Sequence, residues 1–356
     1  MPSVLVTTAR GSYRRQRGGA QSLHHSTGLR DRPGLGARSG RFASVQVQAQ
    51  SPTPGRQFRA IDFTADILQY AKGDSRVSVV IPVRNEAATI GEIVRLIHTD
   101  LVAGSGLVDE LLVIDSDSSD DTAVMARQAG AIVHHARDIR PELGWVPGKG
   151  EAMWKSLFVS TGEIVVFIDG DLTSFTSSYV TGLLGPLLNH SDVQLVKAFY
   201  DRDLGIAADG TAQGGRVTEL MARPLISSWW PELSGVIQPL AGEWAVRRSL
   251  LQTLSIPCGY GVEFAVLIDT YNRLGPDAIA QVDLGVRTHL HQDLASLGAM
   301  ATEVLSAASR RRFGDVPSTG TKIVHPARAA GAEPVTWTTR SINDTERPPH
   351  DSMTAK

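Results

Sequence analysis

The sequence predicts an α/β fold with a doubly wound, mainly parallel sheet. Short runs of β-branched residues, which are typical of strands covered on both faces, alternate with segments whose apolar residues take helical spacing. This alternation continues over about a hundred residues, as expected for repeated strand-helix units. The chain has 356 residues, of which 42% are hydrophobic, so it can bury a sizeable core in one large domain or two ordinary ones.

The predicted elements follow one another in a regular order. Ordered structure is expected to begin near Phe58 and to lead into a helix. The predicted strands cover residues 77–82, 111–114, 131–134, 165–168 and 280–286. Helical spacing of apolar residues predicts a helix after each of the first three strands, the third beginning at Lys149. Asp117, Asp120 and Asp121 precede the second helix, where we interpret them as capping residues rather than as a metal cluster.

Polar residues follow three of the predicted strands at the point where each strand ends. Pro82 to Glu86 follow the first strand, Asp115 and Ser116 the second, and Asp169 and Asp171 the strand over 165–168. Ligands of doubly wound sheets bind at the carboxyl ends of the strands, so we expect these residues to converge on one crevice. Two carboxylates about 5 Å apart repel by roughly 3 kcal/mol at an effective dielectric constant of about 20, which favours a bound cation. An acidic turn that faces water is the alternative.

Both ends of the chain differ in composition from the middle. We predict that residues 1–57 form a disordered extension, because many Arg residues meet one acid, Asp31, amid Ser, Gly and Gln. An Arg-rich, acid-poor start also resembles an organellar transit peptide, and a misassigned start codon would look the same. We predict a flexible C-terminal tail over 314–356, where Pro, Thr and Arg recur.

Composition and motifs argue against several classes of protein. The net charge of −2 provides no general attraction to nucleic acid or to an anionic membrane. No apolar segment reaches the roughly 20 residues needed to span a bilayer, and the single cysteine, Cys258, excludes an internal disulfide framework. We therefore expect a soluble, cytoplasmic protein. The glycine motifs of dinucleotide-dependent oxidoreductases and of P-loop enzymes are absent from the first strand-helix unit.

The polar strand ends resemble those of GT-A nucleotide-sugar glycosyltransferases. The resemblance is carried by Val80 to Glu86, Val113 to Thr122 and Asp169 to Asp171. It is closer to the glucosyl-3-phosphoglycerate synthases of actinobacteria, runs from about residue 61 to residue 312, and includes further blocks at 148–154, 215–219, 238–243, 259–263 and 286–289. The resemblance implies a GT-A (Rossmann-like) domain over 58–313, with a nucleotide-sugar-binding part at about 76–200 and C-terminal acceptor-binding elements at about 201–313.

This resemblance implies an enzyme that transfers glucose from UDP- or GDP-glucose to the 2-hydroxyl of 3-phospho-D-glycerate, with retention of configuration and with Mg²⁺ or Mn²⁺. The product, glucosyl-3-phosphoglycerate, would be a precursor of glucosylglycerate and of methylglucose lipopolysaccharide. A related transferase that uses another sugar or a polyprenyl-phosphate acceptor, and a non-catalytic nucleotide-sugar-binding protein, are the alternatives. Neither nucleic acid nor a membrane is an expected partner, and a homodimer is left open.

The resemblance also implies roles for individual residues. Donor-binding residues are expected to be Pro82, Val83, Arg84, Asn85, Glu86, Ser116, Lys149, Asp169, Gly170, Tyr260, Gly261, Val262, Glu263 and Arg287. Catalytic roles fall to Asp171, Lys149, Glu263 and the Leu240 carbonyl, and metal ligation falls to Asp171 and His289. Acceptor-binding residues are expected to be Gly215, Arg216, Val217, Thr218 and His291. The residue types at 214–218 also suit an oxyanion, because glycines, a guanidinium and a hydroxyl stand at a predicted helix start. His291 departs from the asparagine that the family typically has there.

Overall fold

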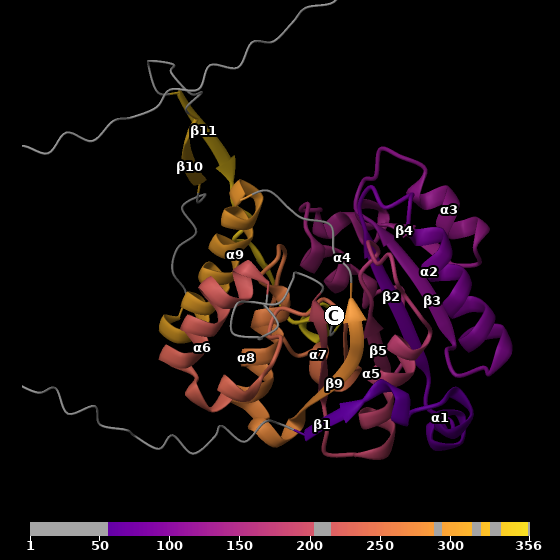
Figure 1. Cartoon of the computed structure of the whole chain (residues 1–356). Helices are drawn as coiled ribbons and strands as arrows, with labels where there is room; N and C mark the ends of the chain where they lie inside the picture. Colours follow the sequence, from indigo (N-terminus) through magenta and orange to yellow (C-terminus); the bar gives the residue numbers. More distant parts are fainter. Residues whose placement is uncertain (1–55, 203–214, 288–293, 315–321, 328–335, 355–356) are drawn as a thin grey trace, which may run out of the picture. The chain divides into compact units, whose positions relative to one another are not determined.

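An eight-stranded mixed sheet forms the centre of the part of the chain that the structure describes (Figure 1). The computed structural model describes residues 56–202, 215–287, 294–314, 322–327 and 336–354. The strand order is β1 (Arg56–Arg59), β9 (Ile279–Arg287), β6 (Leu195–Arg202), β7 (Trp244–Arg247), β5 (Ile164–Phe167), β2 (Val77–Val83), β3 (Glu110–Asp115) and β4 (Ile132–His135). Neighbouring strands are parallel except where β7 pairs with β5 and β6. The predicted mainly parallel sheet is confirmed, with β7 as an antiparallel strand that the sequence did not indicate.

Strand β2 illustrates why the central strands read as continuous apolar runs. All of its residues are buried, because helices cover both faces of the sheet. Successive side chains of a strand point to opposite faces. Val79 and Ile81 accordingly belong to one hydrophobic core, whereas Val80 belongs to the other.

The helices are divided between these two cores. Helices α1 (Ala65–Lys72), α2 (Ile90–Ile97), α3 (Thr122–Gln128) and α5 (Ser178–Asn189) contribute buried residues to the core that contains Val79. Helices α4 (Lys149–Ser156), α6 (Arg223–Trp229), α7 (Arg248–Leu251), α8 (Val262–Leu274) and α9 (Leu294–Phe313) contribute to the core that contains Val80. The segments η1 (Ala60–Asp62), η2 (His98–Gly104), η3 (Ala136–Asp138), η4 (Pro141–Leu143), η5 (Thr218–Ala222), η6 (Pro231–Gly235) and η7 (Pro276–Ala278) are shorter or irregular helical turns. The predicted helices after the first three strands are therefore confirmed as α2, α3 and α4.

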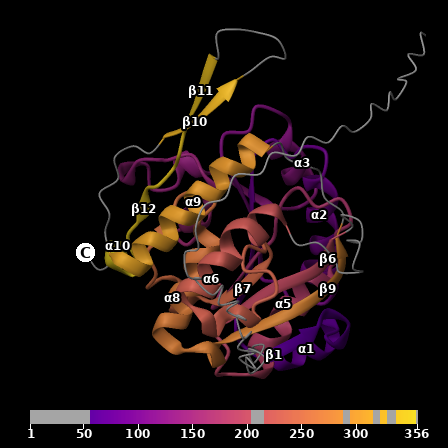
Figure 2. The same cartoon turned by 60° about the vertical axis from the view of Figure 1, so that its left-hand side comes forward.

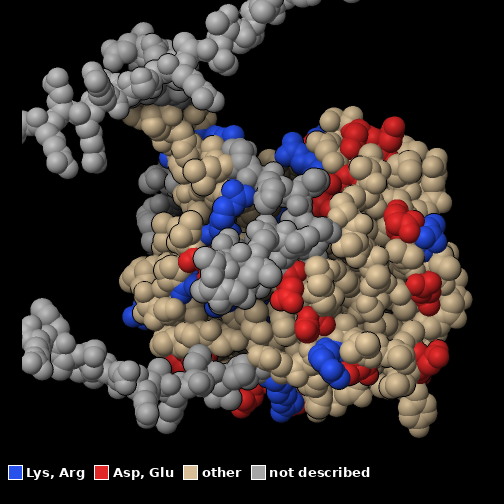
Figure 3. Space-filling view, in the orientation of Figure 1, with Lys and Arg blue, Asp and Glu red and all other residues tan. Residues whose placement is uncertain are grey.

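The surface offers neither a membrane span nor a single block of charge on the visible face. None of the described helices is long and apolar enough to cross a bilayer. On the face drawn in Figure 3, acidic and basic side chains are scattered rather than gathered by sign. That distribution agrees with the near-neutral net charge of −2.

The first described residues already belong to the sheet. Strand β1 pairs in parallel with β9, with Arg56 opposite Ala280. The predicted extension ends at residue 57, which lies within β1, so the extension was predicted two residues too long; the helix expected to follow is α1. A strand of four residues carries too little periodicity to be recognised in a sequence. The rest of the predicted extension, residues 1–55, lies outside the described residues.

The C-terminal part is folded where the structure describes it. Strands β10 (Lys322–Ala327) and β11 (Thr336–Ser341) form an antiparallel hairpin, β12 (Glu346–Arg347) pairs with β8 (Ile256–Pro257), and α10 (His350–Thr354) follows. Figure 2 shows β12 and α10 beside α9. The predicted flexible tail over 314–356 is therefore wrong for residues 322–327 and 336–354, while 315–321, 328–335 and 355–356 lie outside the described residues.

An ion pair explains how this segment obtains its order. The Arg347 guanidinium donates to both carboxylate oxygens of Glu151, at 2.7 Å each, and the Trp154 indole N–H donates to the Pro348 carbonyl at 2.8 Å. Glu151 is fully buried, so it needs a cationic partner. The order of this segment therefore comes from distant partners rather than from its own composition.

We expect the substitution Arg347→Ala to destabilise the protein by about 3–5 kcal/mol, because it leaves the buried Glu151 carboxylate without its cation. Urea unfolding followed by circular dichroism measures this loss. Arg95→Ala is the control, since Arg95 pairs with Glu92 on the surface, where solvent screens the pair, and its loss should change stability far less. Equal effects of the two substitutions would contradict this account of the tail.

Candidate active site

A cavity of about 500 Å³ opens at the carboxyl ends of β2, β3 and β5. It is lined by Pro82, Val83, Arg84, Glu86, Ser116, Pro147, Gly148, Lys149, Asp169, Gly170, Asp171, Tyr200, Gly215, Arg216, Val217, Thr218, Leu240, Gly242, Gly259, Tyr260, Glu263, Leu297, Met300, Glu303, Val304 and Asn343. Polar residues from all three strand ends are among them, although Asn85 and Asp115 are not; the Asp115 carboxylate accepts from the Ser118 hydroxyl and contacts the His135 ring instead. The prediction that these strand ends converge on one crevice is therefore confirmed.

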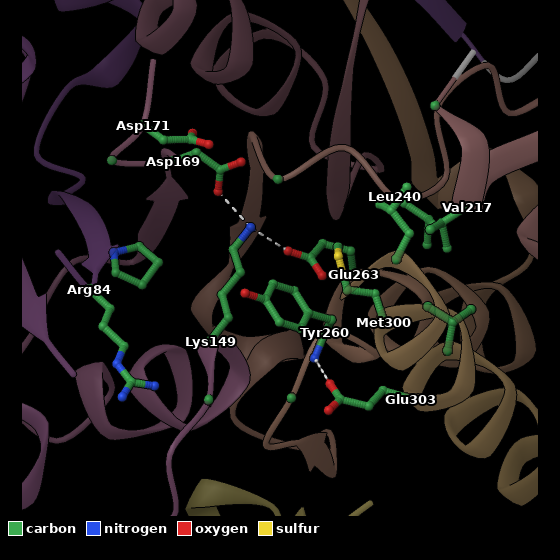
Figure 4. A pocket seen from close by; sticks show the side chains of 18 of the residues that line it. Arg84, Lys149, Asp169, Asp171, Val217, Leu240, Tyr260, Glu263, Met300 and Glu303 are labelled. Carbon is green, nitrogen blue, oxygen red and sulfur yellow. Dashed lines mark hydrogen bonds and ion pairs between the residues drawn. The ribbon is translucent and has the colours of Figure 1, made fainter. Parts of the chain in front are cut away.

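Lys149 joins two carboxylates at the centre of the cavity. Its ammonium nitrogen lies 2.5 Å from Asp169 Oδ1 and 2.7 Å from Glu263 Oε1 (Figure 4). Burial opposes the charge of Lys149, but the two carboxylates outweigh burial and raise the pKa of the amine well above its ordinary value. Lys149 is therefore a fixed positive charge, suited to hold an anionic group and unsuited to act as a base near neutral pH.

Glycines allow the elements around Lys149 to approach closely. A Cβ atom added at Gly150 would lie 1.8 Å from the Pro257 carbonyl oxygen, so α4 could not begin where it does with any larger residue there. A Cβ atom at Gly242 would lie 2.2 Å from Asp169 Oδ2. The loop before β7 thus keeps the Asp169 carboxylate in place.

Glu86, Asp169 and Asp171 gather negative charge at the end of the cavity formed by β2 and β5. Burial raises the pKa of Glu86 to about 7, and the charges of Asp171, Asp169 and Asp120 add to the shift. Carboxylates that repel one another in this way fit a divalent cation, which prefers oxygen ligands. The other predicted ligand, His289, lies outside the described residues.

Of the two predicted metal ligands, the structure describes Asp171. Within the described ranges, no three His, Cys, Asp or Glu side chains are grouped so that they could hold a metal ion by themselves. Further ligands would have to come from a bound molecule or from residues outside those ranges. The site fits a cation that bridges the protein and an anionic substrate.

The predicted acceptor loop lines the cavity on the side of Leu240. Gly215 to Thr218 stand at the start of a helical segment, where the Glu219 N–H donates to the Gly215 carbonyl at 2.9 Å. Arg216 is exposed and Thr218 is buried. The helix predicted to start here is η5 followed by α6. His291 lies outside the described residues.

Three predicted donor residues are not among the lining residues. Asn85 adopts a left-handed conformation with φ of 60°, its N–H donates to Ser118 Oγ at 2.9 Å, and its Oδ1 accepts from the Ser119 N–H at 2.8 Å. It therefore orders the loop between β3 and α3. Gly261 and Val262 are buried at the start of α8, behind the cavity wall. The side chain of a fourth, Arg287, lies outside what the structure describes.

The aspartates between β3 and α3 bind protein groups. Asp120 Oδ1 accepts from the N–H and hydroxyl of Thr122, as the capping interpretation expects. Asp117 instead pairs with Arg137. Asp121 occupies the position before α3 without a capping hydrogen bond from its side chain. The capping interpretation therefore holds for Asp120 only.

Several cavity residues were not predicted from the sequence. Leu297, Met300 and Val304 line it from α9, and their helical spacing was the available signal. Glu303, also on α9, accepts from the Tyr260 N–H at 2.7 Å. Asn343, Glu303 and Tyr200 carry no local signal for such a site; Asn343 fell within the expected tail.

A buried lysine supports the site from behind. Lys197, in the middle of β6, donates to the Ala241 carbonyl at 2.7 Å. Burial lowers its pKa to about 8, although the carboxylates of Glu263 and Glu243 oppose this shift. The signal in the sequence that could have indicated this buried lysine is its position within an apolar run. Lys197 therefore holds the loop that precedes Gly242.

Comparison with known proteins places the chain among glycosyltransferases. The glycosyl transferase family 2 model matches residues 78–242. The glucosyl-3-phosphoglycerate synthase of Mycolicibacterium paratuberculosis is 44% identical over 304 residues, which cover 84% of this chain and 91% of the relative. That of Mycobacterium tuberculosis is 49% identical over 256 residues, which cover 70% and 77%.

Solved structures of the Mycobacterium tuberculosis enzyme share the fold. The complex with Mn²⁺, UDP and phosphoglyceric acid is 42% identical, with a TM-score of 0.75, and the alignment covers 84% of this chain and 99% of the other. The complex with Mn²⁺ and UDP-glucose is 43% identical, with a TM-score of 0.73 and coverages of 82% and 95%. The complex with Mg²⁺ and UDP is 42% identical, with a TM-score of 0.75 and coverages of 84% and 99%. The similarity thus spans nearly all of the solved chains.

We expect Glu86→Gln to stabilise the metal-free protein increasingly as pH rises from about 4.5 through 7. The folded state holds the Glu86 proton to about pH 7 while the unfolded chain releases it near 4.5, so wild-type stability falls in this window. Melting temperatures in chelator, measured from pH 4.5 to 8 for both proteins, test this difference. Added Mn²⁺ should reduce it.

The matched control is Glu92→Gln. Glu92 is exposed, and its hydrogen bond from Arg95 lowers its pKa, so this substitution should bring no stabilisation that grows with pH. A constant difference between Glu86→Gln and wild type across the range would contradict the raised pKa of Glu86.

Proposed function

The chain belongs to the glucosyl-3-phosphoglycerate synthase family of glycosyltransferases, and from that premise we propose that it transfers glucose from UDP-glucose to the 2-hydroxyl of 3-phospho-D-glycerate. UDP leaves and glucosyl-3-phosphoglycerate is formed. The solved relatives bind UDP-glucose, phosphoglyceric acid, and Mn²⁺ or Mg²⁺, which supports the same substrates and the same metals here.

One observation carries the proposal. The cavity is lined by Lys149 on one side and by Arg216 of the Gly215–Thr218 loop on the other, so two cationic side chains face one space. A nucleotide-sugar and a phosphorylated acceptor each bring an anionic group. A cavity of about 500 Å³ also lies within the usual size range of small-molecule sites. The arrangement supports transfer between two anionic substrates rather than binding of one.

The donor side offers binding groups for a nucleoside diphosphate. Asp169 can accept hydrogen bonds from ribose hydroxyls, because a carboxylate has two acceptor oxygens. Lys149 supplies positive charge where charge develops on the departing diphosphate. Asp171, with His289 from outside the described residues, would hold Mg²⁺ or Mn²⁺. When bound, the cation neutralises charge on the diphosphate.

We place glucose transfer on a retaining path in which no carboxylate becomes attached to the sugar. Glu263 Oε1 lies 2.7 Å from the Lys149 ammonium, and this pairing makes Glu263 a weak nucleophile. The acceptor 2-hydroxyl then attacks the anomeric carbon from the side that the diphosphate leaves. The bond from that carbon to the phosphate oxygen breaks, the new bond to the acceptor oxygen forms, and the hydroxyl proton passes to the departing phosphate.

The acceptor side is assigned to the Gly215–Thr218 loop. Arg216 can bind the acceptor phosphate with two parallel N–H donors, and the Thr218 hydroxyl can add a third. The loop leads into η5, and the first N–H groups of a helical segment suit an anion. This assignment places the acceptor phosphate away from the cation, where the diphosphate would otherwise compete for it.

The activity test combines two donors with two acceptors. Purified protein with Mn²⁺ should consume UDP-glucose and 3-phosphoglycerate, use GDP-glucose less efficiently, and use D-glycerate poorly because it lacks the phosphate. Nuclear magnetic resonance of the product should identify the α-anomer, which retention from UDP-α-glucose requires. A β-anomer, or a clear preference for GDP-glucose, would overturn the corresponding part of the proposal.

We expect Arg216→Ala to lower kcat/KM for the phosphorylated acceptor by about thirtyfold to a thousandfold. Loss of a charge-assisted, two-donor contact is worth roughly 2–4 kcal/mol. The Kd of UDP-glucose, measured by calorimetry, should stay within about threefold, and D-glycerate turnover should fall little further. Loss of UDP-glucose binding at an unchanged acceptor KM would show that this loop belongs to the donor side.

A further inference from the structure

Three segments that are far apart in the sequence meet at one rim of the cavity. They are the Pro147–Lys149 loop before α4, the Gly259–Gly261 loop before α8, and the Ile342–Arg347 segment of the C-terminal part. Glu303, on α9, lies between the last two. We propose that Glu303, assisted by Asn343, is a positioning residue that fixes the two loops presenting Lys149 and Tyr260 to the donor.

Both oxygens of Glu303 accept backbone hydrogen bonds. The Tyr260 N–H donates to Oε2 at 2.7 Å, and the Asn343 N–H donates to Oε1 at 3.1 Å. A carboxylate can accept at both ends, whereas a glutamine presents an N–H group at one of them. The N–H group of an isosteric glutamine would face one of the two backbone N–H groups, and that hydrogen bond would be lost. Only a carboxylate can accept from both loops.

The surrounding glycines are adapted to this carboxylate. A Cβ atom added at Gly259 would lie 2.1 Å from Glu303 Oε2, and one added at Gly261 would lie 2.9 Å from the Glu303 carbonyl oxygen. The contact at Gly261 is with backbone and leaves no room for a side chain, whereas a side chain at Gly259 would displace the Glu303 carboxylate. The backbone of the loop before α8 therefore packs directly against Glu303.

Asn343 extends the contact to the loop that carries Lys149. Its side-chain amide donates to the Pro147 carbonyl at 2.7 Å. Farther along, the Cys258 N–H donates to the Thr345 carbonyl at 2.8 Å, and the Glu151 N–H donates to the Cys258 carbonyl at 2.9 Å. The C-terminal segment therefore makes hydrogen bonds both to the loop before α4 and to the chain that leads into the loop before α8.

These ties reach the groups proposed to act on the donor. Lys149 is the first residue of α4, and Glu263 lies in the first turn of α8. A shift of either loop changes the 2.7 Å contact between Lys149 and Glu263. The two hydrogen bonds that Glu303 accepts come from the donor-side rim and not from the Gly215–Thr218 loop, so a positioning role predicts an effect on the donor and not on the acceptor.

The inference rests on the proposed transfer reaction, and Glu303→Gln tests it. We expect the KM for UDP-glucose to rise about tenfold, as the loss of one charge-assisted hydrogen bond implies, while the acceptor KM stays within about twofold. The Kd of UDP, measured by calorimetry with Mn²⁺, should weaken similarly. A fall in kcat alone, with both KM values unchanged, would indicate fewer folded molecules and would overturn the inference.

Glu110→Gln is the matched control. Glu110 also accepts a backbone N–H, from Thr161 at 2.8 Å, but it begins β3 at the opposite end of the strand from the cavity. The Glu110→Gln substitution should lower the melting temperature and leave the KM values for donor and acceptor unchanged. If wild type and Glu110→Gln both fail to form product, the proposed function fails. The UDP calorimetry then still decides the role of Glu303.

Asn343→Ala is the second variant, for the case that Glu303→Gln does not fold. It removes the bond to Pro147 and leaves the backbone N–H that Glu303 accepts. We expect the KM for UDP-glucose to rise severalfold, with the acceptor KM unchanged. If neither Glu303→Gln nor Asn343→Ala alters donor KM or UDP affinity, the positioning role is excluded.

Discussion

The candidate site depends on the burial of one ammonium group between two carboxylates. A buried amine keeps its charge only when opposite charges lie close by, and Lys149 has Asp169 at 2.5 Å and Glu263 at 2.7 Å. The three side chains come from the start of α4, the end of β5 and the start of α8. One charge cluster therefore links two helices of the same core to a strand end, and glycines at 150 and 242 make the close approach possible.

Acidic and basic side chains line different parts of the cavity. Glu86, Asp169 and Asp171 concentrate negative charge at the end formed by β2 and β5, where the proposed cation would bind, while Lys149 and Arg216 line other parts of the cavity. A substrate pair with a diphosphate and a separate phosphate, as proposed above, matches this pattern. Charge arrangement of this kind selects a binding mode more than it adds affinity.

Local patterns in the sequence predicted the parts of the fold that are themselves local. The apolar run of β2 and the carboxylates after β5 can be recognised without knowledge of their partners, because a strand buried on both faces and a sheet edge each leave a short signature. Arg347 and Asn343 could not be recognised, since their partners Glu151 and Pro147 are each 196 residues away in the chain. The antiparallel β7 was missed for the same reason: pairing direction is decided by chain topology.

The strand pair β8–β12 places a chain-terminal segment behind a loop of the site, and this has a consequence for biosynthesis. At about 5–20 residues per second, a separation of 196 residues means that the ribosome makes Glu151 roughly 10–40 s before its partner Arg347. The central strands can pair during that interval, because β2, β3 and β5 are complete by residue 167. Throughout it, the α4 region carries a carboxylate whose counter-charge has not yet been synthesised. The nascent chain can therefore pair its central strands before the α4 region obtains its counter-charge.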